Sequence, residues 1–477
     1  MTSSDDAQEP DAAPAASDVH YLELRDAAQL VQSRQISAVE LTKSQLERID
    51  RLDGRLGSFA FRTTELALKQ ARKADAEIER GEIRGPLHGV PIAVKDVADT
   101  KGIPTAAGMP IHKDRVPDSD ATIVTRLAQA GSILLGKLVL TEGVYAEHRE
   151  PFAAPTNPWS EDHWCGASSS GSGVSIAAGL CFGALGSDTG GSIRLPSSMN
   201  GVTGIRPTWG RVSRAGVFEL AATLDQVGPM ARSAADAAAI LGVIAGADPA
   251  DPTAATEHVP DYLTEIGKDI RGLRIGLDPS FAFTDVDEVI VAAVKGAIKV
   301  FEDLGAEVRE INFPDPTEML DDWFGVCAVQ TALAHEETYP SRKDEYGPSL
   351  SEALDLGLGI SGVEYQKLLL RRAAYRGRVE AAFADIDVMV IPVMGFTTPT
   401  LDQVAHIDEA MILGLHKFTC PFPMAGVPTI TMPAGFAPGN LPVAVQLVGR
   451  HFDEATLVRA GHAFQGATDW HKRHPAL

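Results

Sequence analysis

Apolar and polar positions follow two different periods along this 477-residue chain. Apolar residues recur with helical spacing across 27–31 and across 41–52. Further along, two short apolar runs at 273–277 and 307–311 flank a helical pattern over 289–304. A strand, a helix and a second strand in that order are typical of a parallel sheet unit. The pattern therefore predicts an α/β chain.

The run from Gly89 to Asp96 is apolar, rich in β-branched residues and contains Lys95 near its end. Such a run predicts a buried strand. A lysine at the end of a buried strand loses solvation of its charged form, so its pKa falls from near 10.4. A fall of roughly 3 units makes the amine largely neutral at pH 7 to 8, where it can act as a general base. The alternative is a lysine whose amine reaches solvent from the strand end.

Two serine clusters lie between Cys165 and Ser198. The second cluster, Asp188 to Ser192, contains consecutive glycines, which allow neighbouring backbone N–H groups to converge on one point. A carbonyl oxygen held there would be stabilised as Ser192 attacked its carbon. An isolated Gly-Gly-Ser triplet is more typical of a surface turn than of such a site. After the first cluster, the Val174–Gly179 run predicts a loop that enters a helix, whose N-terminus adds positive partial charge.

Four segments, in order, resemble the amidase signature family: G-V-P-x-x-x-K-D at 89–96, a Gly/Ser-rich segment at 166–171, an Ala/Gly-rich run, and D-T-G-G-S-I-R at 188–194. Further blocks at 201–208, 210–213, 224–233 and 441–450 extend the resemblance from about residue 22 to about residue 465. This chain has Ala167 and Ser170 where the family usually has glycine, and Ser187 where threonine is common.

The resemblance implies an α/β fold, with one large domain built on a twisted mixed β-sheet that α-helices cover on both faces. It implies a Ser-Ser-Lys triad in which Lys95 is the base, Ser168 the bridging serine and Ser192 the nucleophile. A cis peptide bond is expected before Ser168. The amides expected to bind the oxyanion are those of Thr189, Gly190, Gly191 and Ser192. Supporting side chains are expected from Ser169, Asp188 and Arg194.

Composition narrows the function further. The net charge of −22 disfavours nucleic acid and anionic membranes as partners, and no apolar run approaches the 18 residues of a membrane span. The four cysteines show no C-x-x-C and the thirteen histidines no H-E-x-x-H, so we expect no metal, no cofactor and a reducing cytoplasmic location. Residues 1–17 are predicted to be a disordered tail and 18–477 an amidase domain, with its signature core at about 85–235.

The substrate pocket is expected from segments outside the signature, about 142–164 and 314–422. Its apolar candidates, each of which is also a candidate core residue, are Tyr145, Phe152, Trp164, Trp323, Phe324, Met394 and Phe396. They predict a small apolar or aryl amide as substrate, with esters and carbamates as further substrates. His148 and Arg149 are alternative contacts for a polar substrate, as exposed loop residues. We expect a monomer or homodimer. The alternatives are a glutaminase-type subunit of a tRNA-dependent amidotransferase and a catalytically silent scaffold.

Overall fold

The structure, a computed structural model, describes residues 19–477, so the tail predicted at 1–17 lies outside the described residues. The described chain forms an eleven-stranded mixed sheet in the order β1-β3-β2-β4-β6-β5-β10-β11-β9-β7-β8. The strands are β1 (Phe59–Arg62), β2 (Pro91–Lys95), β3 (Ile133–Leu138), β4 (Gly183–Asp188), β5 (Thr203–Arg206), β6 (Gln226–Ala231), β7 (Arg274–Leu277), β8 (Glu307–Glu310), β9 (Val388–Pro392), β10 (Thr429–Ala437) and β11 (Leu441–Gly449).

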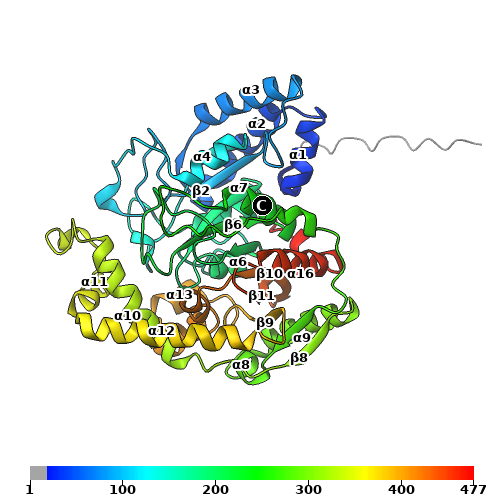
Figure 1. The fold of residues 1–477 in the computed structure, drawn as a ribbon. Coiled ribbons are helices and arrows are strands. Elements are labelled where there is room, and N and C mark those ends of the chain that lie inside the picture. Colours follow the sequence, from blue (N-terminus) through cyan, green and yellow to red (C-terminus); the bar gives the residue numbers. More distant parts are fainter. Residues whose placement is uncertain (1–18) are drawn as a thin grey trace, which may run out of the picture.

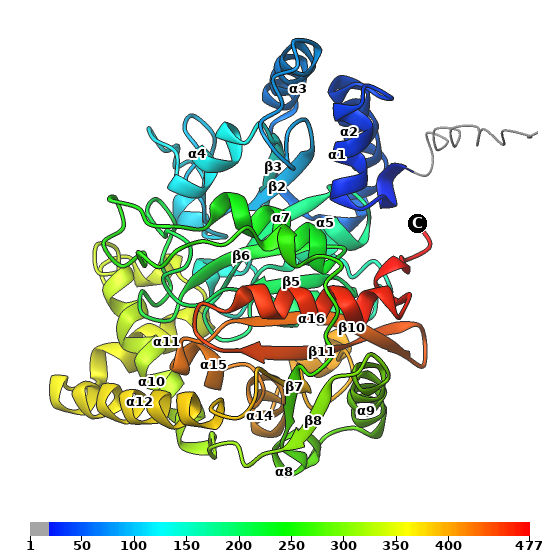
Figure 2. The same ribbon diagram turned by 45° about the vertical axis from the view of Figure 1, so that its right-hand side comes forward.

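Helices lie on both faces of this sheet (Figures 1 and 2). On one face Thr203 of β5 accepts a hydrogen bond from Gln465 of α16, whereas a side chain at the next position, Gly204, would meet Ser197 of α6 on the other. The helices are α1 (Leu24–Gln32), α2 (Ala38–Leu56), α3 (Thr64–Glu79), α4 (Thr122–Gln129), α5 (Ser170–Ala177), α6 (Arg194–Asn200), α7 (Ala234–Ile244), α8 (Pro279–Phe283), α9 (Glu288–Asp303), α10 (Thr317–Ala334), α11 (Pro348–Gly359), α12 (Gly362–Ala382), α13 (Leu401–Ala405), α14 (Glu409–His416), α15 (Pro421–Ala425) and α16 (Glu454–Gly466). The predicted α/β fold with a helix-covered mixed sheet is confirmed.

The elements predicted from periodicity are also confirmed. The two N-terminal helical patterns correspond to α1 and α2, and the strand, helix and strand unit corresponds to β7, α9 and β8, with β7 and β8 parallel. Local chemistry sets the bounds of α2. Ser37 and Glu40 form a reciprocal capping box at its start, and Gly57 ends it in the left-handed region at φ 64°.

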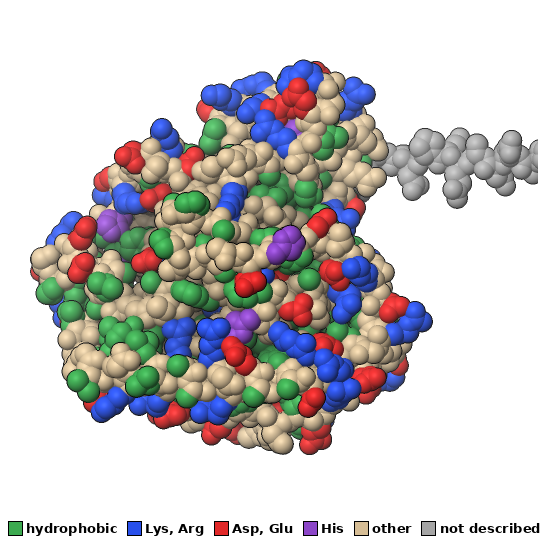
Figure 3. All heavy atoms as spheres, in the orientation of Figure 1, with side chains coloured by type: hydrophobic (Ala, Val, Ile, Leu, Met, Phe, Trp, Pro, Cys, Tyr) green, Lys and Arg blue, Asp and Glu red, His purple; other side chains and the backbone are tan. Residues whose placement is uncertain are grey.

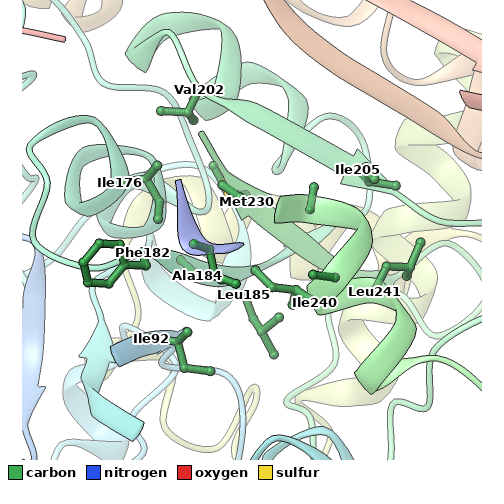
Figure 4. Close-up of a cluster of buried hydrophobic side chains, with 14 of the residues drawn as sticks. Ile92, Ile176, Phe182, Ala184, Leu185, Val202, Ile205, Met230, Ile240 and Leu241 are labelled. Atoms are coloured by element: carbon green, nitrogen blue, oxygen red, sulfur yellow. The ribbon is translucent and has the colours of Figure 1, made fainter. Parts of the chain in front are cut away.

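Buried aliphatic side chains from the central strands fill the space between the sheet and its helices (Figure 4). Ile92 of β2, Leu185 of β4 and Met230 of β6 belong to this buried cluster, together with Ile176 of α5 and Ile240 of α7. Because these strands are buried on both sides, they have few polar positions. Within residues 19–477 no helix is both long and apolar enough to cross a membrane.

The direction of the strands brings the signature segments to one edge of the sheet. β2 and β4 are parallel neighbours, so their last residues, Lys95 and Asp188, lie at the same edge. β6 runs antiparallel to β4 with Gln226 opposite Asp188, which places the preceding Asp225 at that edge too. The edge therefore collects polar groups from separate parts of the sequence.

Candidate active site

Lys95 lies at the centre of this edge and is 1% exposed. Its Nζ is 2.7 Å from Ser168 Oγ, 2.9 Å from Ser187 Oγ and 3.0 Å from Ser169 Oγ. Burial lowers the pKa of Lys95 to about 7, against the smaller opposing influence of the buried Asp188 carboxylate. The alternative of a lysine that reaches solvent is therefore wrong, and the amine is surrounded by hydroxyls rather than by a carboxylate.

The hydrogen bonds around Lys95 indicate in which contacts its amine donates a proton and in which it can accept one. Ser169 Oγ donates to the carbonyl of Ser187 at 3.2 Å, so its contact with Lys95 is one in which the amine donates. A neutral amine has two N–H donors and one lone pair, so a second hydroxyl can accept and a third can donate. Ser168 makes the shortest of the three contacts. Its hydroxyl is well placed to donate to the lone pair of neutral Lys95.

The first serine cluster contains Ala167 and Ser170 at positions where the family usually has glycine. The peptide bond between Ala167 and Ser168 is cis, as the resemblance implied. Ser170 begins α5, and its hydroxyl lies 3.3 Å from the carbonyl of Val139 and 2.8 Å from Nε2 of His148. Ser168 and Ser169 are both fully buried. The departure from the family pattern thus leaves both serines directed at Lys95.

The predicted oxyanion loop, Thr189 to Ser192, follows β4 directly. Gly190 admits no side chain, because a Cβ there would lie 2.3 Å from the Trp323 ring, and Gly191 has a φ of +138° that strains any other residue. The Gly191 amide donates to Asp188 Oδ1 at 3.0 Å, so it is already occupied. The amides of Gly190 and Ser192 have no acceptor among residues 19–477. Ser192 itself is partly exposed between buried neighbours, which suits a residue that meets a substrate.

Asp188 fixes the base of the loop through a buried ion network. Its carboxylate lies 2.8 Å from Arg194 Nη2 and 3.4 Å from Arg206 Nε, and it accepts the backbone N–H of Ile193 at 3.0 Å. Burial by itself raises the pKa of Asp188, but the two arginines outweigh it and lower the pKa to about 2. Asp188 and Arg194 therefore form a buried ion pair at the base of this loop, and both are fully buried.

Sequence reasoning missed three contributors to this site. Ser187, which stands where threonine is common in the family, is the third hydroxyl around Lys95. Asp225 accepts a 2.5 Å hydrogen bond from Thr189 Oγ1, and burial raises its pKa to about 6. Arg206 is the second partner of Asp188. Asp225 and Arg206 lie in the family-like blocks 224–233 and 201–208, and the resemblance of those blocks was the available signal.

Six of the seven predicted pocket residues lie in apolar clusters. Two of these clusters border the catalytic loop, which is the predicted oxyanion loop from Thr189 to Ser192. Trp323 donates its indole N–H to the carbonyl of Thr189 at 3.0 Å, and it packs against Phe324 and His416. On α6, Leu195 packs in a cluster that includes Trp164, Met394 and Phe396. Tyr145 lies between the cluster that contains Trp323 and a neighbouring one.

The seventh, Phe152, is buried against Phe61 of the edge strand β1 instead, with ring centroids 6.1 Å apart. His148 and Arg149 also differ from the expected exposed loop residues. His148 is half-buried, and burial, with a smaller influence of Lys95, lowers its pKa to about 4. Arg149 forms an ion pair with Glu142, in which Nη1 lies 3.1 Å from Oε1. Within the described part of the chain, no group of three or more His, Cys, Asp or Glu side chains is arranged to hold a metal ion.

The sequence of this chain is similar to those of known amidases and of an amidotransferase subunit. The Amidase family model matches residues 40–458. The Mycobacterium tuberculosis protein named Putative amidase AmiD is 47% identical over 461 residues, which cover 96% of this chain and 97% of that protein. A glutamyl-tRNA(Gln) amidotransferase subunit of Carboxydothermus hydrogenoformans is 37% identical over 490 residues, with 96% and 100% covered.

Among solved structures, that of 6-aminohexanoate cyclic dimer hydrolase complexed with substrate is similar with a TM-score of 0.87 at 27% identity, covering 96% of this chain and 99% of that one. The family match spans most of the sequence, and the fold match spans nearly the whole described chain. The buried lysine contacts two serines of the first cluster and a serine of β4. The chain therefore belongs to the amidase signature family of serine hydrolases.

Proposed function

We propose that this protein hydrolyses small apolar or aryl amides through an acyl-enzyme on Ser192. The observation that carries the proposal is the buried amine of Lys95, held among three serine hydroxyls with a pKa lowered to about 7. A neutral amine in that position is a base at ordinary pH. Ser192 is the partly exposed residue of the adjoining loop, and its carbonyl accepts the N–H of Ser169 at 3.2 Å.

In the proposed acylation, Ser192 Oγ forms a bond to the substrate carbonyl carbon. Its proton passes to Ser168 Oγ while the Ser168 proton passes to Lys95 Nζ, which becomes an ammonium. The carbonyl oxygen gains the negative charge and is held by the free amides of Gly190 and Ser192. Each such donor typically contributes roughly 3 kcal/mol to the stability of the transition state.

The return of the proton determines what is cleaved. The Lys95 ammonium gives its proton back through Ser168 to the leaving nitrogen, the C–N bond breaks and an amine departs. Water then attacks the acyl-enzyme, which releases a carboxylic acid and regenerates Ser192. An amide nitrogen leaves poorly unless it is protonated, whereas an ester oxygen needs this less. We therefore expect esterase activity beside amide hydrolysis, and carbamates as further substrates.

Two apolar clusters favour an apolar acyl or leaving group. Trp323 covers the backbone of Gly190, and Leu195 joins Met394 and Phe396 three residues beyond Ser192. A substrate carbonyl at the loop would place its substituents against these surfaces. The proposal includes the two pocket segments, about 142–164 and 314–422, within one amidase domain that spans residues 18–477.

A second candidate is the glutaminase-type subunit of a tRNA-dependent amidotransferase. It is favoured by the 37% identity to the Carboxydothermus amidotransferase protein over 96% of this chain, and the same triad would serve it. The higher identity to the AmiD protein, 47%, favours the free amidase. The two candidates differ in substrate, because a glutaminase-type protein would prefer glutamine to an apolar amide.

The test is a substrate panel on the purified full-length chain: benzamide, hexanamide, phenylalaninamide, glutamine, ethyl benzoate and phenyl carbamate. We expect kcat/KM for benzamide or hexanamide to exceed that for glutamine by at least about tenfold. Ser192→Ala should abolish turnover, and Ser198→Ala, six residues further along, should retain it. A preference for glutamine would establish the glutaminase-type function instead, and no turnover of any substrate would favour the silent scaffold.

A further inference from the structure

A cavity of about 420 Å³ lies beside α12, within the size range of small-molecule pockets. None of the residues proposed for catalysis lines it. Its lining includes six large aromatic, basic or sulfur-containing side chains: Trp209, Arg372, Arg376, Met424, His451 and Phe452. They come from the segment after β5, from α12, from α15 and from the segment after β11. Four distant parts of the sequence thus form one site.

The ionisable groups that line the cavity are all basic. They are Arg372, Arg376 and His451, and no aspartate or glutamate among residues 19–477 lines it, although the chain carries a net charge of −22. Lysine and arginine side chains also gather over α12 on the face drawn in Figure 3. Beside the cavity, the Glu380 carboxylate lies 3.0 Å from Nε of Arg376 and 3.5 Å from Nδ1 of His451. It accepts from Nε of Arg376, and the two terminal nitrogens of that guanidinium have no hydrogen-bond partner within the described part of the chain.

Arg372 has no carboxylate partner among residues 19–477. Its guanidinium donates to the carbonyl of Met424 at 3.0 Å and to the hydroxyl and carbonyl of Thr223, each at 2.7 Å. Burial lowers the pKa of Arg372 to about 10, so it stays charged at neutral pH. A half-buried charge bonded to neutral oxygens leaves positive potential in the cavity, which an anion would neutralise.

Two aromatic side chains, Trp209 and Phe452, also line the cavity, and hydrogen bonds hold their positions. The indole N–H of Trp209 donates to the carbonyl of Ala222 at 3.1 Å. Phe452 has a φ of +61°, which is rare for a bulky side chain, and its N–H donates to Thr208 Oγ1 at 2.8 Å. Arg211 stacks over the Phe452 ring at 4.7 Å. Strained residues that the surroundings hold firmly are typical of ligand-binding sites.

We propose that this cavity binds a small organic anion with a flat apolar body, such as an aryl carboxylate. The carboxylate of the ligand forms an ion pair with Arg376 and is attracted by the positive charge of Arg372. Its apolar body lies against Trp209 and Phe452. Pairing between a guanidinium and a carboxylate is strong and directional, which suits a pocket lined by the exposed guanidinium of Arg376. The proposal is independent of the function proposed for the Ser192 site.

The test is calorimetric titration of the full-length Ser192→Ala protein, in which benzamide is not consumed, with benzoate and with benzamide. These two probes have nearly the same shape and differ in charge. We expect saturable benzoate binding and at least about tenfold weaker benzamide binding. Arg376→Gln should weaken benzoate about tenfold, and Arg376→Lys should weaken it less, since it keeps the charge.

The matched control is Arg378→Gln, an exposed arginine two residues away on α12 that does not line the cavity. It should bind benzoate as the parent protein does. Equal benzoate affinity in Arg376→Gln and Arg378→Gln would place any binding elsewhere, for example at the catalytic loop, and would overturn the proposal. No saturable benzoate binding would also overturn it, as would benzamide that binds as tightly as benzoate and loses the same affinity in Arg376→Gln.

Discussion

Two buried lysines on neighbouring strands have opposite surroundings. Lys95 ends β2, and among residues 19–477 its amine hydrogen-bonds only to the hydroxyls of Ser168, Ser169 and Ser187. Lys137 lies on β3, in register with Val94, and its Nζ is 3.0 Å from Asp96 Oδ1 and 2.6 Å from Thr105 Oγ1. Both amines are essentially inaccessible to solvent. Burial alone therefore does not distinguish a base from an ion pair.

The groups in contact with each buried lysine amine determine whether it acts as a base or as part of an ion pair. Hydroxyls leave the buried Lys95 without a counter-ion in contact, so desolvation dominates and its pKa falls to about 7. At the second lysine, burial lowers the pKa of Lys137 and raises that of Asp96, while their mutual attraction opposes both shifts. A close carboxylate favours the ammonium and makes the residue structural. Three predictions test this contrast, from the largest expected effect to the smallest.

Lys95→Met should lower kcat/KM for an amide by about 10⁴-fold, because the base is lost and the leaving nitrogen receives no proton. Turnover of the matching ester should fall less. Steady-state kinetics on paired amide and ester substrates measure both, with circular dichroism as the check on folding. Amide turnover within tenfold of the parent would show that Lys95 is not the base. An equal loss for amide and ester would show that the relay acts mainly on Ser192.

Lys137→Met should lower the free energy of unfolding by about 3 to 5 kcal/mol, because it leaves the Asp96 carboxylate buried without its partner. The double variant Lys137→Met/Asp96→Leu should recover most of that loss, since both charges are then gone. Urea unfolding at pH 7.5 provides the measurement. A loss below about 1 kcal/mol in the single variant would mean that the ion pair contributes little, and the contrast with Lys95 would fail.

The pH profile should show a single acid limb in kcat/KM near pH 7. Lys95 accepts a proton only when it is neutral, so activity should fall about tenfold for each pH unit below its pKa and level off above it. His148→Gln is the control, because the pKa of His148 is already lowered to about 4 and the limb should stay in place. A limb that disappears in that variant would assign the titration to the histidine.

Much of the fold could be predicted because the signals are local. The periodic patterns located α1, α2, α9 and the parallel strands β7 and β8, since helix and strand periods follow from backbone geometry alone. The run that ends in Lys95 was predicted as a buried strand for the same reason, and β2 is buried at every position. The strand order could not be predicted in this way, because neighbours such as β5 and β10 are more than 200 residues apart.

For the site, the resemblance supplied the candidate residues and the structure supplied their contacts. Lys95 and Ser168 meet as expected, Ser169 also contacts Lys95 directly, and Asp188 pairs with Arg194. Besides His148 and Arg149, two further details differ. The Gly191 amide is occupied by Asp188, and Phe152 packs on the edge strand instead of beside the catalytic loop. Both depend on the direction of a single side chain, which sequence spacing does not specify.

The sequence by itself determined which chemical groups are present and which segments are strands, because residue identity and local periodicity are properties of the chain. Only the tertiary structure decided what each group touches. It placed Ser187 beside Lys95, Asp225 beside Thr189 and Asp96 beside Lys137, across separations of 92, 36 and 41 residues. Since the proton affinity of a buried group depends on its neighbours within a few ångströms, the role of each lysine became fixed only when the strands had assembled.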